Sequence, residues 1–244
     1  MKLAIAIPTY NESKNLPKLV KSIKKVAASI DGLNTTVLVL DDNSPDGTGK
    51  IADQLAKSEK TKDFSVQVSH RKKKEGLGKA YVAGFKDLIK TDADYIMQMD
   101  ADLSHDPKYL PGFIKEAEAG RDFVVASRYV KGGATPDWSF ARKLQSRGGN
   151  LYTRVFLGSK ITDYTGGYNL YSKGLLKKIG LDGLQAGGYG FLIELKYEAL
   201  KKCKSVSQVP IVFMDRQHGT SKIPRNTLLA NLLLVPQLRF GRKP

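Results

Sequence analysis

The feature that most constrains this chain is the regular alternation, over its first 130 residues, of short apolar runs with longer runs of helical period. Five short runs rich in β-branched residues are strand candidates, at residues 3–7, 36–40, 64–68, 95–99 and 123–126. Between the first two, apolar residues recur at three- and four-residue spacing from Leu16 to Ile30, which predicts a helix with one buried face. Strands separated by helices are typical of a doubly wound parallel sheet in an α/β domain.

Polar residues follow four of the five strand candidates. These polar segments are residues 8–12, 41–48, 100–102 and 127–129. In an open parallel sheet, ligands bind in the crevice outside the carboxyl ends of the strands. The sequence therefore predicts a ligand site along that edge of the sheet.

Asp100 and Asp102 flank one small residue at the end of the fourth strand candidate. Alternation along a strand points positions i and i+2 the same way, so both carboxylates can reach one ion. Hard oxygen ligands suit Mg²⁺ or Mn²⁺, whose coordination is usually completed by substrate phosphates and water. An isolated Asp-x-Asp is more often a solvated turn, but its place after a strand favours a metal site here.

A second acidic pair, Asp41 and Asp42, follows the second strand candidate and begins a segment rich in turn formers. Ser44 can cap a helix whose first residue is Pro45. A carboxylate at this strand end can also accept a hydrogen bond from a base N–H or a ribose hydroxyl, as in other nucleotide-binding sheets. The two roles are compatible, and we expect both.

The basic segment 70–79 contains a Gly-Leu-Gly-Lys run that fits no known phosphate loop. Lys73 and Ala80 stand where a Walker loop has Gly and Ser or Thr, and Tyr81 stands where a dinucleotide fingerprint has its third glycine. A phosphate-steering loop and a solvated basic loop both remain open. Single arginines elsewhere can match phosphate oxygens with a guanidinium fork. The candidates are Arg128, Arg142, Arg147 and Arg216.

Charge and motif content exclude several classes of protein. The net charge of +16, from 40 Lys and Arg against 24 Asp and Glu, favours nucleic acid, anionic lipid or phosphorylated partners. No helix-turn-helix, zinc finger or ribonucleoprotein motif is present, so we expect no nucleic-acid partner. His105 and His218 have no nucleophile pattern near them, which argues against a hydrolase. The one cysteine, Cys203, indicates a reducing compartment.

The second half of the chain predicts two basic amphipathic segments, a helix at 140–157 and a tail at 225–244 that follows a domain at 1–224. Between them we expect a helix at 191–201 and a strand at 206–214. No window approaches the roughly 20 apolar residues of a spanning helix. The tail can dock on a membrane surface or pack against its own domain, and the sequence leaves both open.

Many of these segments are motifs of one enzyme family. They are residues 8–12, 41–48, 76–78, 99–105, 126–130, 142–143, 162–163, 188–189 and 219–222, together with Ser146 and Glu194. In this order, over about nine-tenths of the chain, they resemble the dolichol-phosphate (polyprenol-phosphate) mannose synthases of inverting glycosyltransferase family 2. The resemblance implies a single domain of GT-A type, with a Rossmann-like, doubly wound sheet that is mixed but mainly parallel.

The resemblance also implies a role for individual residues. Those that would bind the nucleotide sugar are Pro8, Tyr10, Glu12, Leu40, Asp42, Asp100, Ala101, Asp102, Arg216 and Lys222. Those that would hold Mg²⁺ or Mn²⁺ are Asp100, Asp102 and Ser104. Those that would bind the acceptor phosphate are Arg128, Arg142 and Ser146. The catalytic set would be Asp100, Asp102, Arg128 and Arg142.

The reaction implied is transfer of mannose from GDP-mannose to a dolichyl or polyprenyl phosphate with inversion. A phosphate monoester is already anionic near neutral pH, so it can attack the anomeric carbon without a general base. Gly166, Asn169 and Leu192 differ from residues common in relatives. UDP-glucose or a UDP-N-acetylhexosamine stays an alternative donor, because the strand-end motifs report a nucleotide diphosphate better than they report the base or the sugar.

The resemblance further implies where the protein works. Many members of the family carry C-terminal spanning helices, and this sequence resembles the short type that sits on the membrane. We expect a peripheral protein on the cytoplasmic face, with a membrane-embedded helper subunit as a further partner. Each Lys or Arg near an anionic leaflet contributes roughly 1 kcal/mol to such attachment.

Overall fold

Strand β1 (Lys2–Thr9) lies in the middle of a seven-stranded sheet and is buried on both faces. Leu3, Ile5 and Ile7 point into one hydrophobic core, whereas Ala4 and Ala6 point into the other. A strand covered by helices on both faces needs such a continuous apolar run.

The computed structural model describes residues 1–214 and 227–241, and it orders the strands β3-β2-β1-β4-β6-β5-β7. The other strands are β2 (Asn34–Asp41), β3 (Phe64–His70), β4 (Tyr95–Gln98), β5 (Phe123–Ser127), β6 (Asn169–Ser172) and β7 (Val206–Pro210). Strand β6 runs antiparallel between β4 and β5, and the other six strands share one direction. The mixed, mainly parallel sheet is therefore confirmed, although β6 itself is too short to show a pattern in the sequence.

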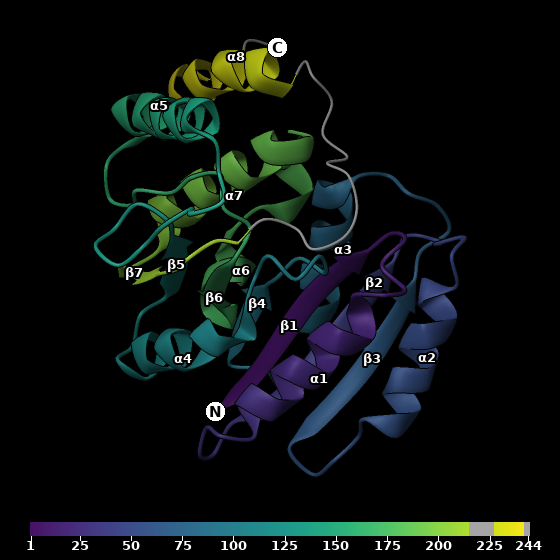
Figure 1. Cartoon of the computed structure of the whole chain (residues 1–244). Coiled ribbons are helices and arrows are strands. Elements are labelled where there is room, and N and C mark those ends of the chain that lie inside the picture. Colours follow the sequence, from purple (N-terminus) through teal and green to yellow (C-terminus); the bar gives the residue numbers. More distant parts are fainter. Residues whose placement is uncertain (215–226, 242–244) are drawn as a thin grey trace.

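Helices cover both faces of the sheet. They are α1 (Leu16–Ala27), α2 (Thr48–Ser58), α3 (Leu77–Ile89), α4 (Leu110–Glu118), α5 (Phe140–Leu157), α6 (Lys173–Lys178), α7 (Gly188–Lys202) and α8 (Thr227–Phe240), with short 3₁₀ turns at Pro107–Tyr109 and Leu181–Gly183. Helices α1, α2 and α4 pack into one core, and α3, α6 and α7 pack into the other. Helices α5 and α8 contact each other at the end of the molecule far from the N-terminus (Figure 1). Within the described part of the chain, no helix is long and apolar enough to cross a membrane.

The helices predicted from sequence form, with small differences at their ends. The first ends at Ala27 rather than Ile30, because the chain tightens into a turn in which the Ser29 hydroxyl donates to the Val26 carbonyl at 2.7 Å. The helix at 140–157 is α5, and the one at 191–201 begins earlier, as α7. The last predicted strand stops at Pro210, as β7.

The loop after β2 corrects one expectation, because Ser44 does not cap a helix. Helix α2 starts at Thr48, behind Gly47 in the left-handed region at φ 87°, so the proline after Ser44 lies in the loop. The Ser44 hydroxyl instead donates to Asp41 Oδ1 at 2.6 Å. At the start of α2, the Asp46 carboxylate instead accepts a hydrogen bond from the Thr48 N–H at 3.0 Å.

The C-terminal helix packs on its own domain. Leu234 and Val235 are buried, and the Tyr152 hydroxyl of α5 donates to the Leu232 carbonyl at 2.8 Å. Packing, one of the two alternatives for the tail, is therefore observed for α8. Residues 215–226 and 242–244 lie outside the described residues, and so do the predicted site residues Arg216 and Lys222.

Candidate active site

The carboxyl end of β4 carries the predicted metal ligands. Asp102 is buried, and the Ser104 backbone N–H and hydroxyl donate to its Oδ1 at 3.1 and 2.6 Å. Leu103 has φ 65°, a left-handed turn that brings Ser104 back onto Asp102. Ser104 therefore fixes Asp102, and its own role as a metal ligand remains a prediction.

Asp100 is held by two residues that were not among the predicted site residues, Tyr81 and His105. The Tyr81 hydroxyl donates to Asp100 Oδ1 at 2.6 Å, and burial together with the Asp100 charge raises the pKa of Tyr81, so the hydroxyl keeps its proton. The Asp100 backbone N–H donates to His105 Nδ1 at 2.9 Å. Burial lowers the pKa of His105, and its ring stacks on Tyr168 at 5.0 Å between centroids. His105 is thus a neutral residue that fixes the backbone at Asp100.

The donor atoms of this pair fit a hard cation. Among residues 1–214 and 227–241, no three His, Cys, Asp or Glu side chains gather around one point. A closed protein cage is therefore not what these residues make. Two carboxylates with oxygen donors suit Mg²⁺ or Mn²⁺ completed by a diphosphate and water, rather than zinc with its nitrogen and sulfur ligands.

The two residues of the second acidic pair, Asp41 and Asp42, have different contacts. Asp41 accepts hydrogen bonds from the hydroxyls of Thr9, at 3.2 Å, and Ser44, at 2.6 Å, so it fastens the ends of β1 and β2 together. Asp42 is buried and pairs with Arg71. Burial raises the pKa of Asp42, and the Arg71 charge opposes that rise. Arg71 therefore ties the basic segment 70–79 to this strand end.

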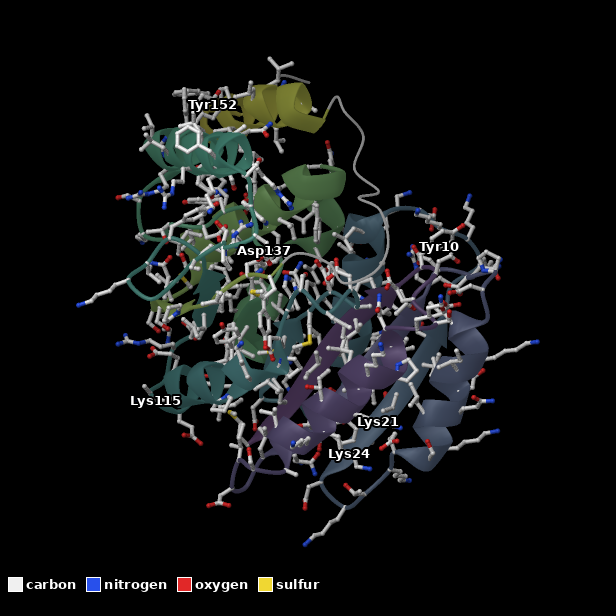
Figure 2. All side chains as sticks on the ribbon, viewed as in Figure 1. Tyr10, Lys21, Lys24, Lys115, Asp137 and Tyr152 are labelled. Atoms are coloured by element: carbon white, nitrogen blue, oxygen red, sulfur yellow. The ribbon has the colours of Figure 1, made fainter. Side chains whose placement is uncertain are left out.

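Tyr10 lies at the same edge of the sheet (Figure 2). The Lys74 ammonium is 4.2 Å from the centre of its ring, so the basic segment also reaches the end of β1. Glu12 follows, and its carboxylate accepts from Asn15 Nδ2 at 2.8 Å. Pro8 is half-buried in β1, next to Leu40 in the ladder with β2. These residues are brought together as the resemblance implied.

Leu40 needs a correction in one respect. Its side chain is fully buried and packs against Gly84 of α3. The side chain therefore belongs to the core under the site, and a ligand at the sheet edge would meet only the Leu40 backbone. Ala101, between the two carboxylates, is buried as well.

Arg128, at the end of β5, makes a buried ion pair. Its Nε and Nη2 atoms donate to the two carboxylate oxygens of Asp163, each at 2.7 Å, and Nη2 also donates to the Thr165 hydroxyl at 2.8 Å. Burial alone would raise the pKa of Asp163, but Arg128 holds it at about 2. The ion pair fixes the direction of the guanidinium.

Trp138 contacts two of the candidate phosphate-binding residues, Arg128 and Arg142. The guanidinium carbons of Arg128 and Arg142 lie 5.2 and 4.1 Å from the centre of its ring. Ser146 joins through Tyr129, whose hydroxyl is 2.5 Å from the Ser146 hydroxyl. Arg128 and Arg142 therefore meet on Trp138, and Ser146 is linked to Arg128 through Tyr129, whose ring centre lies 5.4 Å from the Arg128 guanidinium carbon. Arg147, in contrast, is exposed on α5.

A five-residue loop, 163–167, joins this group to the carboxylates. At one end Asp163 holds Arg128. At the other, a Cβ on Gly167 would lie 3.3 Å from Asp100 Oδ2 and 3.3 Å from His105 Cε1, so glycine lets the backbone pass close to both. Arg128 and Asp100 therefore contact opposite ends of one short loop.

The mixed, mainly parallel sheet covered by helices on both faces has the architecture of the GT-A fold. The family model for glycosyl transferase family 2 matches residues 4–180. The chain belongs to this family and is a glycosyltransferase.

Two curated relatives cover most of the chain. One is undecaprenyl-phosphate mannosyltransferase of Micrococcus luteus, 41% identical over 91% of this chain and 88% of that protein. The other is polyprenol monophosphomannose synthase of Mycolicibacterium smegmatis, 40% identical over 96% of this chain and 85% of that protein.

Solved structures share the fold at lower identity. Glucosyl-3-phosphoglycerate synthase of Mycobacterium tuberculosis, in complex with Mn²⁺, UDP and its product, has a TM-score of 0.68 at 20% identity, with 99% of this chain and 79% of that chain covered. Mannosyl-3-phosphoglycerate synthase of Rubrobacter xylanophilus has a TM-score of 0.68 at 18% identity, with coverage of 98% and 72%.

Proposed function

We propose that this glycosyltransferase moves a mannosyl group from GDP-mannose to a polyprenyl phosphate and inverts the anomeric configuration. The observation that carries the proposal is the loop 163–167, with aspartates for a diphosphate–metal complex at one end and two arginines on one tryptophan at the other. The activities named for the two relatives, at 41% and 40% identity, support a mannosyl group and a polyprenyl phosphate acceptor, whereas GDP as the carrier of the sugar rests on the resemblance of the sequence motifs.

In this proposal, one group of residues binds the sugar donor and a second group binds the acceptor. The donor half comprises Asp100, Asp102, Tyr81, Ser104 and His105. The acceptor half comprises Arg128, Asp163, Trp138, Arg142 and Ser146.

In the donor half, Asp100 and Asp102 would hold Mg²⁺ or Mn²⁺. A bound ion of this kind supplies Lewis-acid stabilisation to the departing diphosphate. The hydroxyls of Tyr81 and Ser104 orient the two carboxylates beforehand, at 2.6 Å each. Tyr10, Glu12 and Asp42, at the ends of β1 and β2, would receive the nucleoside.

In the acceptor half, Arg128 and Arg142 would align the phosphate of the lipid. A phosphate oxygen attacks the anomeric carbon, and the bond from that carbon to the diphosphate breaks, with its electron pair leaving on GDP. No proton moves in this step, which is consistent with His105 being neutral and serving as a support. Attack and departure in line place the new bond opposite the old one.

A donor panel tests the proposal. The enzyme would be given polyprenyl phosphate with GDP-mannose, UDP-glucose or UDP-N-acetylglucosamine, each with Mn²⁺, with Mg²⁺ or with a chelator. We expect labelled lipid from GDP-mannose and its loss on chelation. Transfer from a UDP-sugar alone would support the alternative donor, and transfer that survives chelation would contradict the metal site.

The lipid acceptor requires the site to approach a membrane, and α5 and α8 provide a surface for this. Their exposed apolar side chains form what we call the apolar ridge. Its members are Phe140, Leu144, Leu151, Val155, Leu233 and Phe240. The four residues of α5 recur at four and seven positions, which places them on one helical face. Phe240 continues the ridge through its ring contact with Phe156, at 6.3 Å between centroids.

Basic residues on the same two helices carry the opposite charge to that of an anionic leaflet and are therefore attracted to it. They are Arg142, Lys143, Arg147, Arg154 and Arg239. Three ridge side chains, Phe140, Val155 and Phe240, are 81%, 74% and 77% exposed, which is unusual for such residues. We propose that the ridge enters the headgroup region of the cytoplasmic leaflet, with Arg142 on the same helix at the level of the lipid phosphate.

Vesicle sedimentation tests the membrane proposal. Val155→Glu, and separately Leu144→Glu, should reduce binding to anionic vesicles about tenfold, because each puts a charge into the headgroup region. Thr61→Glu is the matched control, since it adds the same charge at an exposed position before β3. Equal binding by all three variants would contradict the ridge and leave a helper subunit as its occupant.

A further inference from the structure

Helix α7 carries a lysine that no step of the proposed reaction uses. Lys196 is fully buried, and its Nζ donates to the backbone carbonyl of Asp163 at 2.6 Å. Lysines are almost never fully buried unless a partner compensates the charge. A carbonyl alone is a weak reason to bury an ammonium, because a neutral donor would satisfy it at a lower desolvation cost.

The place of Lys196 next to the Asp163–Arg128 pair gives a better reason for a buried ammonium than its hydrogen bond to the carbonyl. Asp163 is the residue that orients Arg128, and its carboxylate also accepts from the backbone N–H groups of Thr165 and Gly166 at 3.2 and 3.0 Å. The carboxylate therefore fixes the loop and the guanidinium together. Lys196 holds the same residue from the backbone side, so Asp163 is clamped at both ends.

The charges around Lys196 come from three other elements. Asp163 lies in the loop after α5, Arg128 at the end of β5 and His105 after β4. The carboxylates of Asp100 and Asp102, after β4, act on His105 from the same side. Burial lowers the pKa of Lys196 to about 7, with Asp163 opposing the fall and Arg128 adding to it. A protonated Lys196 adds a positive charge beside the Asp163–Arg128 pair, and in a low-dielectric region such a charge strengthens the attraction for a phosphate.

We propose that Lys196 is a positioning residue for the acceptor phosphate, which holds the Asp163–Arg128 pair through the Asp163 carbonyl and adds its own positive charge beside that pair. The inference rests on the proposed function, since it takes a lipid phosphate as the ligand of Arg128.

The first test compares Lys196→Met and Lys196→Gln with Leu195→Met, a matched control that repacks the neighbouring, equally buried residue of α7. With short-chain polyprenyl phosphate and GDP-mannose, both Lys196 variants should raise the KM for the acceptor about tenfold, because Arg128 loses part of its support and the phosphate loses a nearby positive charge. The dissociation constant for GDP-mannose should stay within about twofold. A wild-type enzyme without transfer contradicts the proposed function. A working wild type with no selective acceptor defect in either variant contradicts only the role of Lys196.

The pH dependence separates the charge from a structural role. The ratio of acceptor KM values, Lys196→Met over wild type, cancels the ionisation of the acceptor itself. We expect this ratio to fall as the pH rises through about 7, because the wild type then loses the charge that the variant already lacks. A ratio that is constant across this range contradicts the inference.

A second readout needs no substrate. The pKa of Lys196 is about 7 in the folded chain against 10.5 as its ordinary value, so the unfolded chain binds the extra proton between these limits. The urea midpoint of the wild type should therefore rise relative to that of Lys196→Met from about pH 7 to about pH 10. Parallel curves would show that Lys196 is not a perturbed buried ammonium and would overturn the proposal.

Discussion

The donor half and the acceptor half of the site are held by opposite means. Asp100 and Asp102 accept hydrogen bonds from the neutral hydroxyls of Tyr81 and Ser104, so their negative charge remains available to a cation. Arg128 instead has its charge offset by Asp163 in a buried pair. In the donor half, neutral hydroxyls orient the carboxylates and leave their negative charge in place. In the acceptor half, an ion pair orients Arg128, and Arg142 and Lys196 supply further positive charge.

The largest expected effect is on the donor half. Asp102→Asn, and separately Asp100→Asn, should lower kcat by about 10²–10³-fold, because the charge that holds a metal and the diphosphate is lost. The fold should persist, since the hydroxyl of Tyr81 or Ser104 can still donate to the amide oxygen. Near-normal turnover of either variant, with a native circular dichroism spectrum, would contradict the metal site.

The acceptor half should respond first in stability. Asp163→Asn leaves Arg128 buried without its counter-charge, which typically costs about 3–5 kcal/mol in the free energy of unfolding. Urea unfolding measures this loss. Asp92→Asn is the control, since Asp92 pairs with Lys2 at 2.5 Å in an exposed position, where such a pair contributes little. Equal losses of unfolding free energy in Asp163→Asn and Asp92→Asn would contradict the claim that a buried ion pair holds the acceptor half.

The same pair predicts an acid-sensitive stability. The pKa of Asp163 is about 2 in the folded chain against an ordinary value of 3.8. Its stabilisation, of the order of 2 kcal/mol, is present above about pH 4 and is lost as the pH falls toward 2. The difference in unfolding free energy between wild type and Asp163→Asn should shrink over that interval, and a constant difference would contradict the assignment.

Arg142 sharpens the comparison because it is exposed, unlike Arg128. Arg142→Ala should raise the KM for polyprenyl phosphate about tenfold and leave the affinity for GDP-mannose and the unfolding midpoint nearly unchanged. Arg128→Ala should show the same acceptor defect together with a loss of stability, because Asp163 is left unpaired. If the donor affinity alone falls in Arg142→Ala, this arginine belongs to the donor half.

The smallest expected effect is that of Tyr81→Phe, which removes one hydrogen bond to Asp100. We expect kcat to fall by about threefold to tenfold, through a less well oriented carboxylate. The apparent affinity for Mn²⁺ should weaken in parallel. Phe85→Leu, at a buried position of the same helix, controls for repacking. A variant with full activity would remove Tyr81 from the donor half.

The two halves also differ in how much the sequence revealed. Asp100 and Asp102 stand within three residues just after a strand, so a local pattern predicts a metal site there, although β4 ends at Gln98 and strand alternation does not extend to either carboxylate. Asp163 stands 35 residues from Arg128, and no local pattern reports that contact. Trp138 was likewise missed, because its role comes from two arginines that the fold brings to one ring.

Lys196 left a signal that local reasoning could have used. In a helix, positions four before and three after share a face, and here these are Leu192 and Ala199, both buried. A lysine on such a face is a polar residue at a core position, which marks a buried contact. The five predicted strands carry apolar or alternating patterns that burial dictates, whereas β6, a four-residue strand, depends on its neighbours β4 and β5.

The central claim is that the acceptor phosphate, held beside Arg128 and Arg142, attacks the anomeric carbon directly across the loop 163–167. The anomeric configuration of the product tests this most directly. The enzyme would be supplied with α-linked GDP-mannose and short-chain polyprenyl phosphate, and the mannosyl phosphate product would be examined by NMR through its one-bond C1–H1 coupling. A β-linked product is the result we expect from a single in-line displacement. An α-linked product would require two displacements or a front-face attack, and would contradict the account.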